Sequence, residues 1–314
     1  MSSVRSFIDS LIQTSRKEES LYSQLALSLR VGLGILFVVG GTFKLSRALD
    51  PAAADALVAL YVSDKGYINT FFLNYLFEGA LGAILSPWLF LTALSTFELL
   101  SGIALIAGFL VRPLSLIYGL LLWSFVFSLP VTTSPGASIN EPTYMAPAMF
   151  VQIRDIALSG LFFILFNLGS GTKALDHHLT LPQPKRVIPW DNLGLLLRLS
   201  LGVIFLIGGF FAGMPNIKDF AVPGILLVLV GLAMVLGIGV RGAAAIFLMV
   251  ILYYIGTKAS VEQSLVGNLN AIKREIAFLP ASAGLLALGG GRLFTIQNLF
   301  ERFGVRRQAA EQLS

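Results

Sequence analysis

The sequence predicts an all-α integral membrane protein with eight transmembrane helices. Hydrophobic residues make up 56% of the 314 residues, and the mean hydropathy is +0.82. Charged residues make up only 12%, whereas soluble proteins carry about 25%. The chain contains long apolar runs, and a helix of about 20 apolar residues spans the hydrocarbon core of a bilayer. A third observation, an internal repeat, arranges these helices as two sets of four.

The apolar runs place eight spans along the chain. We expect them at about residues 27–45, 88–111, 113–130, 148–169, 193–212, 221–240, 242–257 and 273–290. The segment FFLNYLFEGALGAIL (71–85) is apolar but short, it carries Glu78, and Ser86-Pro87 follows it. We expect an interfacial or re-entrant helix there, and a ninth span is the alternative.

The distribution of basic residues predicts the orientation. With the N-terminus in the cytoplasm, 14 Lys and Arg residues fall on the cytoplasmic side and 8 on the outer side. The positive-inside rule therefore favours two cytoplasmic termini. This rule also accounts for Arg30, Arg112, Arg198 and Arg241, and for the net charge of +5, without a nucleic-acid partner.

Three pairs of stretches reveal an internal repeat. LRVGLGILFVVGG (29–41) matches LRLSLGVIFLIGG (197–209), SGIALIAGFLVR (101–112) matches VGLAMVLGIGVR (230–241), and IRDIALSG (153–160) matches KREIAFLP (273–280). The offsets are 168, 129 and 120 residues. Each repeat contains four spans, an even number, so both copies have the same orientation in the membrane.

These observations predict five regions. Residues 1–22 are a cytoplasmic N-terminal segment, and 23–171 are the first four-helix repeat, with a long extracytoplasmic loop at 46–87. Residues 172–192 are a cytoplasmic linker, 193–303 are the second four-helix repeat, and 304–314 are a cytoplasmic tail. The linker contains His177-His178, for which we expect a structural or interfacial role.

Charged residues on four helices are expected at one depth in the outer leaflet. Arg154 lies 15 residues before Gly169, the cytoplasmic end of its helix, which corresponds to about 22 Å. Similar counts apply to Lys44, Glu98 and Arg274. Ionisable residues inside a span are costly, and they mark ion pairs or functional sites. In the structural interpretation, Lys44 pairs with Glu98 and Arg154 pairs with an acid such as Asp155.

The second repeat lacks one of these charged pairs. By the offsets, Lys44 corresponds to Ala212 and Glu98 to Leu227, whereas Arg274-Glu275 retains the pattern of Arg154-Asp155. The joint loss indicates that Lys44 and Glu98 depend on each other. It also indicates that any special site belongs mainly to the first repeat.

Several stretches resemble the DoxX superfamily: LRVGLGILFVVGGTFKL, FELLSGIALIAGFLVRPLSL and RDIALSGLFFILFNLGSG. The two-repeat organisation resembles the DoxD family, the small subunits of thiosulfate:quinone oxidoreductases. With the second copy, the resemblance covers about residues 27–292. The second repeat departs from the pattern at Ala212 and Leu227, which puts an active role for that repeat in doubt.

The resemblance implies oxidation of thiosulfate to tetrathionate, with electrons passed to quinone in a prokaryotic cytoplasmic (inner) membrane. It also implies a second subunit with an extracytoplasmic domain, in a possible respiratory complex. Thiosulfate is a dianion that buried cations attract, and quinone reduction consumes protons. We therefore expect catalytic roles for Glu98 and Asp155, and substrate binding by Lys44, Arg154, Arg274 and Glu275.

The sequence has no cysteine and no haem, flavin or metal motif, so quinone or a partner is expected to supply the redox group. This absence keeps a second hypothesis open. The chain could be a non-enzymatic membrane protein, either an assembly or accessory subunit of a respiratory complex or a small-solute carrier. Met214-Pro215 and Leu279-Pro280 are the only hints of the broken helices that carriers use.

Overall fold

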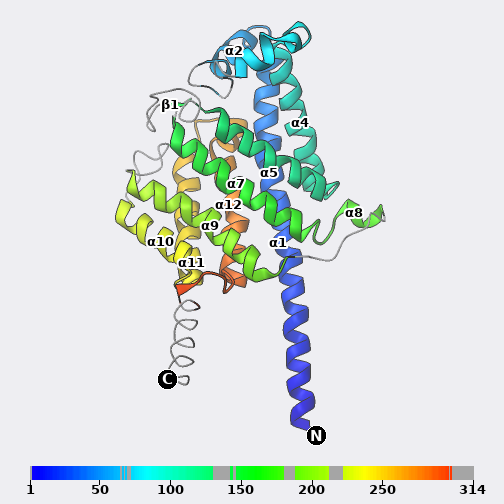
Figure 1. Cartoon of the computed structure of the whole chain (residues 1–314), viewed down its shortest axis with the longest axis vertical. Coiled ribbons are helices and arrows are strands. Elements are labelled where there is room, and N and C mark those ends of the chain that lie inside the picture. The colour runs from blue at the N-terminus through cyan, green and yellow to red at the C-terminus, as the bar shows by residue number, and fades with distance from the viewer. Residues whose placement is uncertain are drawn as a thin grey trace, which may run out of the picture.

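A computed structural model shows an almost entirely helical protein (Figure 1). The structure describes residues 2–63, 66, 68, 72–129, 142–143, 146–179, 188–211, 222–296 and 298. For residues 2–19, 142–143 and 146–148 it describes the backbone alone. The expected tail, 304–314, the position Ala212 and the stretch Met214-Pro215 lie outside the described residues.

Eight long helices occur in two groups of four along the described chain. The first group is α1 (Ser2–Ala48), α4 (Pro87–Ala107), α5 (Val111–Ser128) and α7 (Ala148–Leu168). The second is α9 (Trp190–Phe210), α10 (Gly224–Leu236), α11 (Val240–Lys258) and α12 (Leu265–Leu288). Short elements connect them: α2 (Ala54–Tyr61), η1 (Leu73–Phe77), η2 (Ala80–Ala83), α8 (Leu175–His178), and the two-residue strands β1 (Pro142–Thr143) and β2 (Ala146–Pro147).

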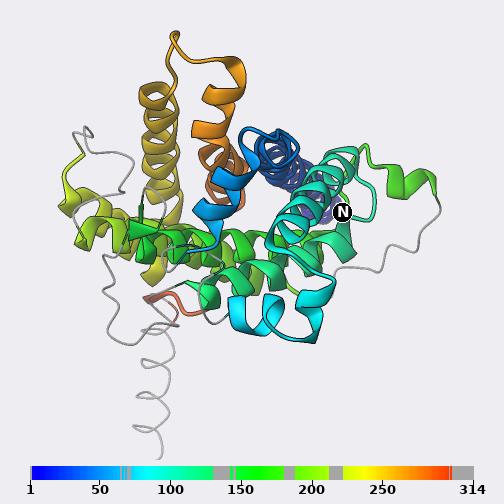
Figure 2. The same ribbon diagram turned by 90° about the horizontal axis from the view of Figure 1, so that it is seen from above.

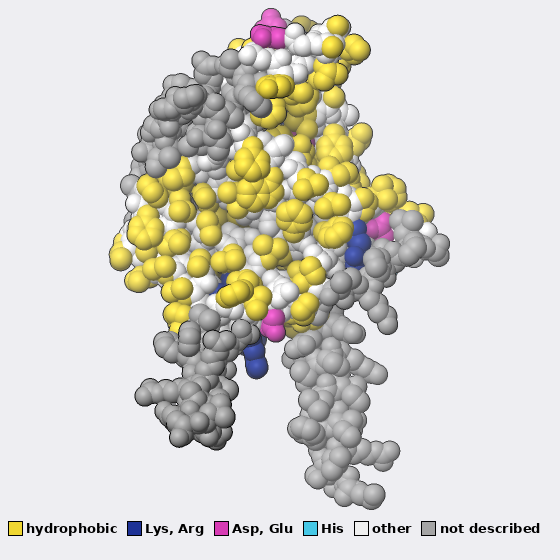
Figure 3. Space-filling model, viewed as in Figure 1, with side chains coloured by type: hydrophobic (Ala, Val, Ile, Leu, Met, Phe, Trp, Pro, Cys, Tyr) yellow, Lys and Arg dark blue, Asp and Glu magenta, His cyan; other side chains and the backbone are white. Residues whose placement is uncertain are grey.

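Six helices are long and apolar enough to cross a membrane: Ser20–Ala48 within α1, and α4, α5, α7 from Met149, α9 and α11. The chain is thus a multi-pass membrane protein. The other two of the eight expected spans fall short of these criteria for different reasons. α10 has 13 residues, a length of about 20 Å against a hydrocarbon core of about 30 Å. α12 is long enough, but it carries Lys273, Arg274 and Glu275 together. In Figure 3, hydrophobic side chains cover the middle of the visible face.

Several helix boundaries differ from those predicted from the sequence. The N-terminal segment was expected as a separate polar region, but it continues α1 without a break from Ser2. The last helix begins at Leu265 rather than near 273, because Ser264 caps it by accepting a hydrogen bond from the Gly267 amide at 3.1 Å. Within 71–85 the chain forms only the short turns η1 and η2, so this segment contains no spanning helix among its described residues.

Small residues let the first two helices of each group pack with their backbones in close contact. A Cβ atom on Gly102 would lie 2.8 Å from the Val38 amide nitrogen and 2.9 Å from the Gly34 carbonyl oxygen. In the second group, a Cβ atom on Gly231 would lie 2.5 Å from the Leu206 nitrogen and 2.8 Å from the Gly202 oxygen. Such close approach is typical of membrane helices that associate through glycine. It brings α1 against α4 and α9 against α10.

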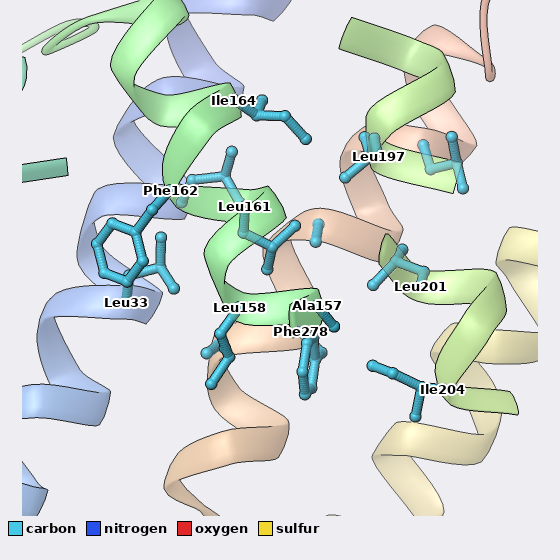
Figure 4. Packing of buried hydrophobic residues seen from close by; sticks show 14 of the residues in the cluster. Leu33, Ala157, Leu158, Leu161, Phe162, Ile164, Leu197, Leu201, Ile204 and Phe278 are labelled. Atoms are coloured by element: carbon cyan, nitrogen blue, oxygen red, sulfur yellow. The ribbon is translucent and has the colours of Figure 1, made fainter. Parts of the chain in front are cut away.

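The helices form two layers, and each layer mixes the two groups. In one layer, α12 packs between α11 and α1, and α4 packs on the far side of α1. In the other layer, α7 packs between α5 and α9, and α10 packs on the far side of α9 (Figures 1 and 2). Between the layers, α7 contributes Leu158, Leu161 and Phe162 to the central core near Leu33, Leu201 and Phe278 (Figure 4).

Candidate functional site

Lys44 of α1 forms an ion pair with Glu98 of α4 inside the bundle. The close packing of the two helices creates this contact, because a Cβ atom on Gly41 would lie 2.6 Å from the Leu99 nitrogen and 2.8 Å from the Ser95 oxygen. Lys44 follows Gly41 by one helical turn and therefore reaches the neighbouring Glu98. Glu98 is only 3% exposed. The pair is one of the two ion pairs that the structural interpretation of the sequence predicted.

The second predicted ion pair joins neighbours on α7. Arg154 Nη2 lies 2.6 Å from Asp155 Oδ1, and Arg154 Nε donates to the same oxygen at 2.7 Å. Asp155 is 2% exposed. Arg154 also lies close enough to Lys44 and Lys273 to interact with them electrostatically. The arginine on α7 thus faces the same region as the lysines of α1 and α12.

α12 adds a third ion pair and a further lysine. Lys258, at the end of α11, pairs with the buried Glu275. Lys273 Nζ donates to Asn270 Oδ1 at 2.7 Å. The same ammonium lies 3.4 Å from where a Cβ atom on Gly40 would stand, and Glu98 Oε2 lies 3.9 Å from that point. Gly40 therefore leaves room for Lys273 to approach the carboxylate that Lys44 already neutralises.

These residues form one cluster with an excess of positive charge. We call it the charged cluster: Lys44, Glu98, Arg154, Asp155, Lys258, Lys273, Arg274 and Glu275. Among the residues that the structure describes, it contains five basic and three acidic side chains, and each of these acids has a basic ion-pair partner. Lys273 also interacts electrostatically with Arg274. Coulomb interactions are strong where water is scarce, so these charges influence one another across the helices.

Two members of the charged cluster were not predicted as site residues. The sequence places Lys258 and Lys273 only among the outer-side charges. Lys258 ends α11, and its partner Glu275 is separated from it by the turn that joins α11 to α12. No spacing rule predicts that contact. Glu275, predicted to bind substrate, is held in this ion pair.

A second buried polar group was also missed. Tyr118 of α5 is completely buried, and its hydroxyl lies 2.5 Å from Ser101 Oγ of α4. Tyr118 also interacts electrostatically with Glu98. Comparing the two repeats expected from the sequence could have found this pair, since the positions offset by 129 residues are Val230 and Phe247. Both hydroxyls are absent there together, as are Lys44 and Glu98.

Arg30 has a structural role beyond the orientation signal that we expected. It is 1% exposed and donates to five carbonyl oxygens. Leu105 and Ile106 supply two of them from the end of α4, and Ser170, Thr172 and Lys173 supply three from the turn after α7. Arg198 similarly donates to Met234, Val235 and Leu293. Each guanidinium binds carbonyls at the end of one helix and in the turn after another, and so links the two.

The linker after α7 packs against the turn between α4 and α5. Asp176 is buried, and its carboxylate accepts hydrogen bonds from the Leu110 nitrogen at 2.8 Å and from Ser170 Oγ at 2.5 Å. His177 Nε2 lies 2.6 Å from the Gly171 oxygen. Among the residues that the structure describes, no group of three or more His, Asp or Glu side chains could hold a metal ion.

Comparison with known protein families identifies one part of the chain, which contains several of the residues described above. A model of the DoxX family matches residues 25–129. This segment is a DoxX domain. The DoxX domain contains α4, α5 and most of α1, and therefore Lys44, Glu98, Ser101 and Tyr118. Arg154, Asp155 and the α12 residues lie beyond it. No curated protein and no solved structure matches the chain.

Proposed function

We propose that this protein is the membrane subunit of a quinone-linked oxidoreductase that oxidises thiosulfate to tetrathionate. The observation that carries the proposal is that Lys44, Arg154 and Lys273 lie close to one another within the helix bundle, partly in the DoxX domain. A small dianion suits such a site, because it can be held by Lys44, Arg154, Lys273 and Arg274. In water the same charges would attract it far less.

The proposed reaction balances with the groups at hand. Two thiosulfates lose two electrons and join through a new sulfur–sulfur bond, and one quinone takes up two electrons and two protons. Glu98 and Asp155 are the acids placed to pass protons, with Lys44 and Arg154 as their basic partners. Glu275 would position Lys258 and the neighbouring Arg274 at the substrate. Any further redox group would belong to a partner.

An outer segment of the chain supports the proposal of a second subunit. Large apolar side chains are exposed on and around α2, η1 and η2, including Leu60, Tyr75, Leu81 and Ile84, the last of which is 80% exposed. This segment forms one end of the molecule (Figure 1). Exposed apolar patches mark protein or membrane contacts. We propose that an extracytoplasmic domain of a partner docks there.

The proposed architecture is eight crossing helices in two parallel repeats, 23–171 and 193–303, with both termini in the cytoplasm. Equivalent hydrogen bonds support it. Arg30 binds the carbonyls of Leu105 and Ile106, and Arg198 binds those of Met234 and Val235, at offsets of 168 and 129 residues. Arg30 also binds the carbonyl of Lys173, and Arg198 binds that of Leu293, which lies 120 residues further along the chain.

Backbone geometry recurs at the same offsets. Gly108 and Gly237 end α4 and α10 with φ of 75° and 71°, and Gly169 and Gly289 follow α7 and α12 with φ of 78° and 77°. These angles suit glycine. The rings of Phe37 and Tyr118 lie 3.9 Å apart between centroids, and those of their counterparts Phe205 and Phe247 lie 4.2 Å apart. Such agreement favours duplication of one four-helix unit.

The decisive assay measures quinone reduction by thiosulfate in membranes that contain the chain and its partner subunit. Replacing Lys273 with Met removes a lysine that lies near Glu98, and we expect the rate to fall at least about 10-fold, equivalent to about 1.4 kcal/mol. Lys173→Met is the matched control, because that side chain is exposed on the linker, and it should retain the wild-type rate.

Substitutions at the predicted acids and bases complete the test. We expect Glu98→Gln and Arg154→Ala to lower the rate while the protein still inserts in the membrane. Full rates in both variants would contradict the assignment of the site. A wild-type membrane that shows no thiosulfate-dependent reduction in the presence of the partner would reject the reaction itself.

The ion pairs favour the second candidate function. Two of the three ion pairs join different helices, Lys44–Glu98 between α1 and α4 and Lys258–Glu275 between α11 and α12, as expected for side chains that hold the helices together. A non-enzymatic accessory subunit or a small-solute carrier would then be sufficient. Uptake of thiosulfate or sulfate into proteoliposomes without an electron acceptor would establish the carrier. Equal assembly of a respiratory complex with and without the chain would exclude the accessory role.

A further inference from the structure

Two helices of the first group, α4 and α5, bury hydroxyl groups near Glu98. On α4, Ser101 follows Glu98 by nearly one helical turn, and both side chains belong to the buried face. On α5, Ser115 and Tyr118 have the same spacing on the buried face. The two faces meet where the Tyr118 hydroxyl lies 2.5 Å from Ser101 Oγ. Both helices are candidate membrane spans, so these polar groups lie where water is scarce.

The Tyr118–Ser101 contact has a defined donor. Ser101 Oγ donates to the Phe97 carbonyl at 2.5 Å, and a serine hydroxyl carries one proton. Tyr118 is therefore the donor to Ser101. Each hydroxyl can also accept, so a rotation of the two groups reverses the direction of the bond. Two hydroxyls that both donate and accept can move a proton without becoming charged.

Aromatic packing fixes the position of the Tyr118 hydroxyl. The ring centroid of Tyr118 lies 3.9 Å from that of Phe37 on α1 and 5.0 Å from that of Phe162 on α7. The ring of Phe97 on α4 lies 5.5 Å away. Because three other helices pack against the ring, it cannot tilt freely. The hydroxyl is therefore held beside Ser101.

Tyr118 also connects the hydroxyl pair with Glu98. Glu98 interacts electrostatically with Lys44 of α1, Lys273 of α12 and Tyr118 of α5. The two lysines are cations, whereas Tyr118 is neutral and can both donate and accept. Because Glu98 is buried, a proton that it gains has to come through a neighbouring group. Tyr118 is suited to supply that proton.

Ser115 extends the line of hydroxyls away from Glu98, toward the turn between α4 and α5. It is fully buried, and within the described part of the chain its Oγ has no hydrogen-bond partner. A buried hydroxyl without a partner costs about 1–3 kcal/mol, and such groups usually bind an internal water. A water bound there, nearly one helical turn from Tyr118, can bridge the two hydroxyls.

A second buried acid lies at the far end of the line. The Asp176 carboxylate accepts a hydrogen bond from the Val111 amide at 3.3 Å, and Val111 precedes Ser115 by about one turn of α5. At the end of α4, the Asp176 amide donates to the Gly108 carbonyl at 3.0 Å. Gly108 follows Glu98 by ten residues, which corresponds to about 15 Å of helix. The hydroxyls thus lie between two buried acids.

The second group of helices has apolar side chains at the positions that correspond to Glu98 and the three hydroxyls. By the offset of 129 residues, the counterparts of Glu98, Ser101, Ser115 and Tyr118 are Leu227, Val230, Ala244 and Phe247. All four counterparts are buried. Apolar side chains therefore satisfy the packing at these positions, and packing alone does not account for the polar groups in the first group.

We propose that Ser115, Ser101 and Tyr118 form a proton path between Asp176 and Glu98. Each hydroxyl gives its proton to the next group toward Glu98 and takes one from the group behind it, so the hydroxyls are unchanged after each transfer. Polar and ionisable side chains inside membrane proteins commonly serve as such relays. In the proposed orientation Asp176 lies on the cytoplasmic side. The path rests on the proposed function, since it names the cytoplasm as the source of the protons that quinone takes up.

Carbodiimide labelling of Glu98 tests the path without turnover. Dicyclohexylcarbodiimide partitions into membranes and reacts with protonated carboxyl groups, so labelling follows the protonated fraction of Glu98. Inside-out and right-side-out vesicles that contain the full chain are held with acidic buffer on one face and alkaline buffer on the other, and mass spectrometry quantifies the labelled peptide. We expect acid on the cytoplasmic face to raise labelling at least about fivefold, because Glu98 is ionised in its ion pair with Lys44 at alkaline pH. Acid on the outer face alone should leave labelling unchanged.

Two substitutions interrupt the path. Tyr118→Phe removes the hydroxyl and keeps the ring, and Ser115→Ala removes the next hydroxyl along the line. In both variants, acid on the cytoplasmic face should no longer raise the labelling of Glu98. Ser282→Ala is the matched control, because Ser282 is a buried serine of α12 whose hydroxyl donates to the Leu279 carbonyl at 2.9 Å. That variant should keep the wild-type response.

Three results would overturn the proposal. The first is wild-type labelling that follows the outer pH or is absent with acid on both faces. The second is an unchanged response in either Tyr118→Phe or Ser115→Ala, and the third is an equal loss of the response in Ser282→Ala. If Tyr118→Phe fails to fold, Ser101→Ala replaces it. A wild-type response that both substitutions abolish, in membranes that oxidise no thiosulfate, would retain the path and reject only the proposed reaction.

Discussion

Lys44 and Glu98 illustrate how a buried ion pair constrains a single residue. Removing one partner leaves an uncompensated charge inside the bundle, which costs about 3–5 kcal/mol. Replacing both with apolar residues can be nearly neutral. The proposed second repeat has Ala212 and Leu227 at the counterpart positions. This combination suggests that α1 and α4 tolerate Lys44→Ala together with Glu98→Leu.

We therefore predict that Lys44→Ala and Glu98→Leu are each more destabilising than the two together. Lys44→Ala alone should lower the free energy of unfolding by about 3 kcal/mol, because Glu98 is then buried without its cation. The double variant should lie within about 1 kcal/mol of wild type. Unfolding in detergent by denaturant titration measures all four proteins. Additive losses would show that the two residues are not coupled.

The double variant also separates structure from function. A protein that folds normally but no longer reduces quinone would assign the pair to the chemistry. If the double variant both folds and reduces quinone normally, the pair serves only to link α1 and α4. The same comparison cannot be made with a single substitution, because that variant changes stability and the local charge together.

The predicted ion pair between Lys44 and Glu98 is confirmed. That Lys44, Glu98, Arg154 and Arg274 lie at a similar depth in the membrane stays a prediction. Lys273 was missed because its approach to Glu98 depends on packing of α12 against α1 and on the space at Gly40. Sequence spacing contains no information on that tertiary contact.

At the level of elements, glycine determines how closely helices pack. Gly102 of α4 faces the α1 backbone, where a Cβ atom would lie 2.8 Å from the Val38 nitrogen. Backbone atoms cannot rotate away as a side chain can, so the helices must separate. The contact between Gly202 and Gly231 repeats this arrangement between α9 and α10.

We predict that Gly102→Ala destabilises the protein by about 1–3 kcal/mol, as overpacking usually does. Gly256→Ala is the control, because Gly256 is an exposed residue of α11 with nothing within 4 Å of the added Cβ. That variant should be as stable as wild type or slightly more stable. Thermal unfolding in detergent compares them. Equal melting temperatures for both variants would show that α1 and α4 are not held by this contact.

Helix existence was easier to predict than helix ends. Every predicted span corresponds to a helix, because long apolar runs leave few alternatives in a membrane. The ends depend on caps and turns instead. Ser264 starts α12 well before its apolar part, and Pro223 and Gly237 flank α10 and leave it at 13 residues. Hydropathy alone does not register these polar and backbone effects.

Over the whole molecule, the two layers explain why neither half of the chain is independent. Each layer contains helices from both proposed repeats, and α7 and α12 lie next to the first helix of the other repeat. The charged cluster combines Lys44 and Glu98 from the DoxX domain with Lys273 from the last helix. A fragment limited to residues 25–129 would therefore lack Arg154, Lys258, Lys273 and Arg274. The sequence predicted two repeats, but it did not predict how they interleave.

Orientation in the membrane provides the last prediction, and the chain suits the test because it has no cysteine. Single cysteines at exposed positions can be labelled with a membrane-impermeant maleimide in spheroplasts. If all eight helices cross, Asp50→Cys and Glu262→Cys will react from outside, and Lys173→Cys and Ile238→Cys will react only after the membrane is opened. If the short α10 does not cross, α11 reverses, so Ile238→Cys becomes accessible from outside and Glu262→Cys becomes protected. The pair at 238 and 262 thus decides between the duplicated eight-helix architecture and a chain in which only the six clearly apolar helices span.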